Sequence, residues 1–336
     1  MTRPRSWAAI TPAVASPWDR QSPSAISPHG ICRPPMTERV QLRQGLILGL
    51  LAALSWGIYN VGAEIGQATG FRPVDLTMLR YGGAALLMLP LLYLARNRLP
   101  ALRQIAILSL LIGPGFALLF NEGFQRAPLS HAVVIGPGTS MLVANILVRL
   151  IDRSKMSWNR NIGMAILIAG LLIIAADAPP PRASGGAVWL GDLCFLGAGS
   201  LWGCYVFIMG RWRLPPIETT AAIATLSSLF FVPLYLIQWG LPPMTPKLWA
   251  EQFFYQSVMG GCLAFIIFAA TVQRLGAGRA ALFSALVPSC AVLLAIPITG
   301  QFPNAWQLTG VIVTTLGLIV SMDLRRARPA RLPTAG

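Results

Sequence analysis

Charged residues are scarce in this chain. They make up 11% of its 336 residues, whereas a typical soluble domain carries about 25%. This scarcity excludes an ordinary surface covered by water. Hydrophobic residues make up 55% of the chain, and the mean hydropathy is +0.63. Much of the protein surface is therefore expected to face lipid.

Metal-ligating residues are also few. The chain has two histidines, His29 and His131, and none of its five cysteines stands in a CxxC pair. Four of the cysteines fall in apolar segments and are expected to be small packing residues. No DxxD pair occurs in these segments, and His131 lies too close to a segment end for a protease triad. The sequence therefore predicts no metal site, no cofactor and no enzymatic activity.

Long apolar runs follow one another along the chain. Each is about 18 to 23 residues long, enough to cross roughly 30 Å of hydrocarbon as a helix. They are Gly45–Gln67, Val74–Arg96, Arg103–Phe124, Leu129–Ile151, Asn161–Ala178, Ala187–Trp212, Ile217–Trp239, Phe253–Val272, Arg279–Ile298 and Trp306–Met322. The predicted fold is an all-α integral membrane protein with ten transmembrane helices.

The basic residues are distributed as expected for a protein that crosses a membrane several times. The chain has 26 Lys and Arg against 11 Asp and Glu, a net charge of +15. If the amino terminus is cytoplasmic and the crossings alternate, nearly all of the basic residues fall on the cytoplasmic side. The outer side keeps only Arg72, Arg126, Arg182 and Lys247. The charge therefore predicts a multi-pass topology with both termini cytoplasmic, and it does not indicate nucleic-acid binding.

Two tails flank the apolar region. Residues 1–44 are rich in Ser, Pro and Arg and are expected to form a disordered cytoplasmic tail, in which Met36 is an alternative start. Residues 324–336 are expected to form a second cytoplasmic tail. Between the tails, the sequence predicts a first five-helix repeat over 45–178 and a second over 187–323.

The two halves share motifs at matching places. These are Trp56–Gly57 with Trp202–Gly203, and Gly163 and Gly170 with Gly310 and Gly317. An odd number of helices in each half would place the halves in opposite orientations across the membrane. Inverted repeats of this kind are typical of secondary transporters, which bind their substrates near the midplane.

Further motifs occur in order along the ten predicted segments of the two halves. They are SWG and LWG in the first and sixth segments, MLRYGGAALL with Arg80 in the second, SHAVVIGPG opening the fourth, and ALFSALVPSCAVLLA in the ninth. Together they resemble the EamA type of the drug/metabolite transporter superfamily, over about residues 45–323. The resemblance implies a carrier of a metabolite or drug, usually an exporter, in a bacterial inner membrane.

Four ionisable side chains fall inside the apolar segments of the first half, where charge is costly and usually functional. They are Glu64, Arg80, Glu122 and His131. Their distances from the segment ends place all four in the outer third of the membrane. We expect a polar cluster in which Arg80 pairs with Glu64 or Glu122 and a carboxylate exchanges a proton. In the alternative interpretation, some of them extend to lipid headgroups.

A second candidate set lies deeper. Trp56 is expected near the midplane and shares a helix face with Asn60 and Glu64, and Trp202 is its counterpart in the second half. Two tryptophans, with Asn60 and Asn145 as hydrogen-bonding groups, predict a cavity for a small organic solute. The alternative role of the tryptophans is helix packing.

The sequence thus predicts a secondary transporter that exports a small metabolite or drug by alternating access, with proton coupling. Sugar-phosphate or nucleotide-sugar exchange is the alternative among carriers, although such substrates need several buried cations. A channel or a non-transporting receptor is the alternative of another class. The expected partners are a small-molecule substrate, the lipid bilayer and protons. Homodimer formation, the substrate and the coupling ion are left open.

Overall fold

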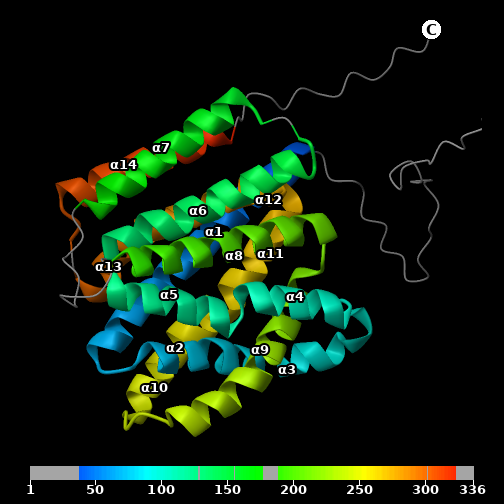
Figure 1. Cartoon of the computed structure of the whole chain (residues 1–336), viewed down its shortest axis with the longest axis vertical. Coiled ribbons are helices and arrows are strands. Elements are labelled where there is room, and N and C mark those ends of the chain that lie inside the picture. Colours follow the sequence, from blue (N-terminus) through cyan, green and yellow to red (C-terminus); the bar gives the residue numbers. More distant parts are fainter. Residues whose placement is uncertain (1–37, 128, 155, 177–187, 301, 323–336) are drawn as a thin grey trace, which may run out of the picture. The chain divides into compact units, whose positions relative to one another are not determined.

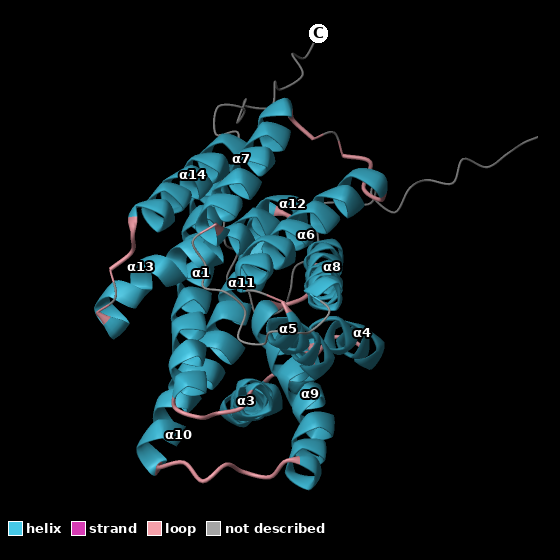
Figure 2. Cartoon of the chain, turned by 60° about the vertical axis from the view of Figure 1, so that its left-hand side comes forward, coloured by secondary structure: helices cyan, strands magenta, loops and turns pink. Residues whose placement is uncertain are grey.

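The computed structural model describes residues 38–322, apart from residues 128, 155, 177–187 and 301. Every regular element in this part of the chain is helical (Figure 2). Helices are the expected choice because lipid offers no partner to a backbone amide, and a helix satisfies its own. The predicted tails lie outside the described residues, except that the first helix already begins at Glu38, ahead of its predicted start at Gly45.

The first repeat runs from α1 to α7 (Figure 1). Its elements are α1 Glu38–Ala68, α2 Pro73–Met78, the π-helical turn η1 Leu79–Gly83, α3 Ala84–Leu94, the 3₁₀ turn η2 Arg96–Arg98, α4 Leu102–Ile112, α5 Pro114–Arg126, α6 Leu129–Leu150 and α7 Trp158–Ala175. Gly113 separates α4 from α5 because Pro114 has no backbone N–H and cannot continue the α4 hydrogen-bond pattern.

The second repeat runs from α8 to α14. Its elements are α8 Val188–Trp212, α9 Pro216–Gln238, α10 Pro246–Gln252, the π-helical segment η3 Phe253–Leu263, α11 Ala264–Leu275, α12 Ala277–Ala280, the 3₁₀ segment η4 Ala281–Leu286, α13 Val287–Thr299 and α14 Ala305–Ser321. Elements that follow without a break, such as α10, η3 and α11, form one continuous helical segment.

Among the described residues, eight helical segments are long and apolar enough to cross a membrane. Two further apolar helices, Val134–Leu150 and Ala305–Ser321, are shorter. Each of the ten predicted segments coincides with one of these. The all-α membrane fold is therefore confirmed, while the number of crossings stays a prediction.

The packing of the helices follows the sequence repeat. Helix α1 packs against α11 and α13, and its counterpart α8 packs against α5 and α6, the counterparts of α11 and α13. Helix α3 packs against α9, and α7 against α14, so these helices pair with their own counterparts. The two repeats are therefore related by an approximate two-fold arrangement of contacts.

The pair α7 and α14 shows this relation most closely, and both views show these helices side by side (Figures 1 and 2). A Cβ atom added at Gly170 would lie 2.6 Å from the Thr314 backbone nitrogen, and one at Gly310 would lie 2.9 Å from the Gly170 carbonyl oxygen. Glycine is needed here because the two backbones approach too closely for a side chain.

Candidate functional site

Two tryptophans related by the repeat are in direct contact. The rings of Trp56 on α1 and Trp202 on α8 have centroids 5.1 Å apart and meet edge to face. Phe265 and Phe268 of α11 complete an aromatic cluster, with centroids 5.1 to 5.8 Å from the two indoles. The cluster is buried, and Trp202 donates its indole N–H to the Ser284 hydroxyl at 3.1 Å. The predicted tryptophans therefore come together, although they pack against one another instead of standing on opposite walls of a cavity.

Arg80 lies beside this cluster. Its side chain projects from η1, and the residue is 7% exposed. The guanidinium donates to the Tyr59 hydroxyl at 3.0 Å and lies 4.8 Å from the Tyr59 ring centroid and 5.2 Å from that of Phe265. Among the described residues, its Nε has no hydrogen-bond partner. Phe265 therefore contacts both the cation and the tryptophans.

The backbone that carries Arg80 is held by η3. The Ser257 hydroxyl donates to the Leu79 carbonyl oxygen at 2.8 Å. A Cβ atom added at Gly261 would lie 2.4 Å from the Arg80 carbonyl oxygen, so only glycine allows this approach. Both η1 and η3 are π-helical, a rare geometry that occurs often at functional sites.

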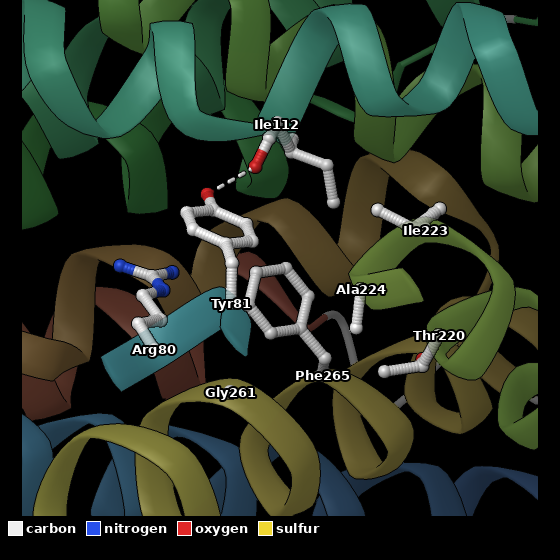
Figure 3. Close-up of a pocket in the computed structure, with 8 residues that line it drawn as sticks. All are labelled: Arg80, Tyr81, Ile112, Thr220, Ile223, Ala224, Gly261 and Phe265. Atoms are coloured by element: carbon white, nitrogen blue, oxygen red, sulfur yellow. Dashed lines mark hydrogen bonds between the residues drawn. The ribbon is translucent and has the colours of Figure 1, made fainter. Parts of the chain in front are cut away.

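A narrow pocket opens at this place (Figure 3). Its walls come from both repeats and are apolar apart from the polar groups of Arg80, Tyr81 and Thr220. The lining residues are Arg80, Tyr81, Ile112, Thr220, Ile223, Ala224, Gly261 and Phe265. The Tyr81 hydroxyl points away to the Ile112 carbonyl oxygen, to which it donates a hydrogen bond (Figure 3). In this state the pocket has room for about one water-sized group.

The predicted polar cluster does not assemble. Glu122 forms an ion pair with Arg126 one turn later on α5, and both side chains are substantially exposed. Glu64 is exposed on α1. Within the described ranges Arg80 has no carboxylate in an ion pair. The predicted pairing of Arg80 with Glu64 or Glu122 is therefore wrong, because Glu64 is exposed and Glu122 binds Arg126, while the Arg80 guanidinium binds Tyr59.

His131 forms an ion pair that was not predicted from the sequence. Its Nδ1 lies 2.6 Å from Oδ1 of Asp192, and both side chains are about one-third exposed. His131 belongs to α6 of the first repeat and Asp192 to α8 of the second. This pair of titratable groups thus spans the contact between the repeats.

The two predicted asparagines are not part of the aromatic cluster. Asn60 is exposed on α1, although Trp56 one turn earlier is buried. Asn145 is 1% exposed and donates to the carbonyl oxygens of Met141 and Gly278. Because Gly278 lies on α12, Asn145 joins α6 to the second repeat, and its amide N–H groups are not free for a solute.

The sequence interpretation missed one buried acid, Asp75. Asp75 is fully buried at the start of α2, where it binds Arg72 and accepts a hydrogen bond from Tyr235 of α9. One signal could have revealed it: Pro73 and Asp75 recur as Pro216 and Glu218 at the start of the corresponding helix α9. An acidic residue in the first turn of both helices indicates a shared role at a helix start.

Comparisons with known proteins agree with this architecture. The model of the EamA-like transporter family matches twice, over residues 43–176 and 189–322. Two relatives come from Bacillus subtilis (strain 168). The uncharacterized transporter YdfC is 24% identical over 84% of this chain and 90% of its own, and the uncharacterized transporter YetK is 23% identical over 88% and 92%.

A solved crystal structure of another protein shares the fold. It has a TM-score of 0.67 at 15% identity, and the match covers 83% of this chain and 96% of that chain. Since the family model matches both repeats and together these matches cover most of the chain, the protein belongs to the EamA-like transporter family and is a multi-pass membrane transporter.

Proposed function

We propose that the protein is a secondary transporter that exports a small metabolite or drug by alternating access, with its substrate site between the aromatic cluster and Arg80. The observation that carries this proposal is the contact of Trp56 with Trp202, which joins the two repeats next to a pocket lined by both. Transporters built from repeats bind their substrates at such places. Aromatic walls with few polar groups suit a small organic solute.

The symmetric packing suggests the conformational change. Helix α1 contacts α11 and α13 in the way that α8 contacts α5 and α6. If the repeats exchange these two local arrangements, the opening moves from one side of the membrane to the other. The contact of Trp56 with Trp202 lies where the repeats meet, so it would have to rearrange in each cycle.

The proposal includes proton coupling through His131. It is the one residue of the predicted ionisable set that has an ion-pair partner in the other repeat, as far as the structure describes the chain. Protonation of His131 or Asp192 changes the charge of their contact and so shifts the balance between two arrangements of the repeats. Glu64 and Glu122 are the competing carriers, and the variants described below separate them.

The test of the transport function starts from intact cells. The culture medium of cells that overproduce the protein is compared with that of cells lacking it, and compounds enriched outside are then tested with purified protein in liposomes. The expected result is saturable exchange that Trp56→Ala reduces at least tenfold. Trp306→Ala is the matched control, because Trp306 is 62% exposed and should leave exchange unchanged. Flux that rises linearly with concentration, without saturation, would instead indicate a channel.

A further inference from the structure

The charge of Arg80 is not balanced by an acid in the described part of the chain. The ion pairs there involve other residues, and Arg80 instead binds a phenol and lies over aromatic rings. Arg72, Arg126 and Arg211, by contrast, each bind a carboxylate. Arg80 is thus the most buried of these four arginines and the one without a counter-charge within the described ranges.

The neighbours of Arg80 offset only part of the cost of burying it. Removing an ion from water has a large free-energy cost even after the protein relaxes. A contact between a cation and an aromatic ring returns only a small part of this cost. The hydrogen bond to Tyr59 uses one N–H of Nη1, whereas the buried Nε has no partner in the part of the chain that the structure describes. The guanidinium therefore still has a donor and a positive charge to offer to a ligand.

We infer that the transported substrate is an organic monoanion whose carboxylate binds Arg80. This inference rests on the proposed transport function and names the substrate class of the same site. The carboxylate would accept a hydrogen bond from Nε, while the rest of the molecule packs against Phe265 and the apolar wall formed by Ile223 and Ala224. Because the present pocket admits only a water-sized group, substrate entry requires the repeats to move apart.

The count of charges favours a monoanion over a phosphate dianion. One guanidinium lines the pocket, and Tyr81 donates its hydroxyl hydrogen to Ile112, so it has no donor to spare. A carboxylate brings one negative charge, which Arg80 neutralises. A phosphate monoester brings nearly two at neutral pH, and the second would stay uncompensated in a buried site. The sugar-phosphate alternative is therefore disfavoured.

The experiment compares acids with their own amides, using the purified full-length protein in detergent. The probes are acetate, benzoate and indole-3-acetate, their three amides, and phenyl phosphate as the dianion. Binding is measured from the shift of the thermal unfolding midpoint with ligand concentration. At least one carboxylate is expected to bind about tenfold or more tightly than its amide, the scale of a hydrogen bond to a charged group. Phenyl phosphate should bind more weakly than benzoate.

Two variants test whether Arg80 causes the preference for acid over amide. Arg80→Gln should remove the preference for acid over amide, and Arg80→Lys should keep it in part. Arg126→Gln is the matched control because Arg126 is a partly exposed arginine of the same repeat, and it should keep the full preference. The comparison of acid with amide needs no variant, so it remains decisive if an Arg80 variant does not fold.

The outcomes separate this inference from the proposed function. If no carboxylate in the panel binds more tightly than its amide, or if Arg80→Gln keeps the preference, the inference is overturned. Saturable, Trp56-dependent exchange of a neutral compound would then still support the transport function. Conversely, if acids bind through Arg80 but no compound is exchanged across liposomes, the transport proposal fails, and with it the assignment of these acids as cargo.

Discussion

The Tyr235 hydroxyl donates a 2.7 Å hydrogen bond to Oδ1 of Asp75 and so joins α9 of the second repeat to the start of α2 in the first. Asp75 is fully buried, and Arg72 donates to the same carboxylate from its backbone and its guanidinium. Arg72 also donates to the carbonyl oxygens of Trp239 and Gly240. The hydrogen bond to Asp75 raises the pKa of Arg72 above its ordinary value, so the guanidinium stays charged.

Asp75→Ala is therefore expected to destabilise the protein. The change leaves the buried Tyr235 hydroxyl without an acceptor and removes the charged partner of Arg72, a loss of about 2 to 3 kcal/mol in the free energy of unfolding. Tyr235→Phe should cost about 1 kcal/mol. Denaturant unfolding in detergent measures both. Glu251→Ala is the control because Glu251 forms a long, exposed pair with Lys247. Equal effects of Asp75→Ala and Glu251→Ala would contradict the assigned role.

The contact of α7 with α14 should not tolerate a methyl group. Gly170→Ala places a Cβ atom 2.6 Å from both Cγ2 and the backbone nitrogen of Thr314, so the helices must separate. The expected loss is about 1 to 3 kcal/mol, measured as a lower unfolding midpoint. Gly115→Ala is the matched control, since a Cβ atom there meets no described atom within 4 Å. A Gly170→Ala protein as stable as Gly115→Ala would show that the helices are less closely packed.

Proton coupling is expected to depend on His131 and Asp192. His131→Gln and Asp192→Asn each remove a titratable group from the contact between the repeats and should abolish transport driven by a pH gradient. Substrate exchange at equal pH should continue, because exchange needs no net proton movement. The measurement compares the two modes in the same liposomes. The opposite pattern, with loss in Glu64→Gln or Glu122→Gln and not in these variants, would support the carboxylates favoured by the sequence.

The orientation in the membrane can be tested with reporter fusions. Fusions after residues 100 and 213 are expected to be cytoplasmic, and fusions near residues 70 and 245 external, because the basic residues gather around the first two positions. A single reversal within this series would refute the ten-helix topology. The same fusions place the amino terminus on the cytoplasmic side if the alternation holds.

The fold could be predicted because its signals lie along the chain. Membrane thickness sets the length of each apolar run, and the repeated Trp-Gly and glycine motifs reveal the duplication. The repeat also placed Trp56 and Trp202 at equivalent positions near the middle of their helices, although it predicted a cavity between them and not the ring contact that the structure shows.

The polar contacts could not be predicted in the same way. Residue spacing gives the depth of Glu64, Arg80 and Glu122 in the membrane. Because these depths are similar, the sequence suggested that the three side chains form a polar cluster. Pairing also depends on the direction in which each side chain points around its helix axis. The structure turns Glu64 outward, pairs Glu122 with a residue of its own helix and places Arg80 against Tyr59. The π-helical turn at Arg80 shifts that direction further, and no sequence period marks it.

The contact between α7 and α14 has a consequence for the origin of the chain. Each side presents glycines at equivalent repeat positions, Gly163 and Gly170 on α7 and their counterparts Gly310 and Gly317 on α14. Two separate half-length polypeptides carrying such glycines would meet through the same surface, because the contact does not distinguish one copy from the other. An ancestral gene of half this size could thus encode a working dimer. Fusion of two copies would have kept that interface intact, leaving each half free to acquire different polar residues.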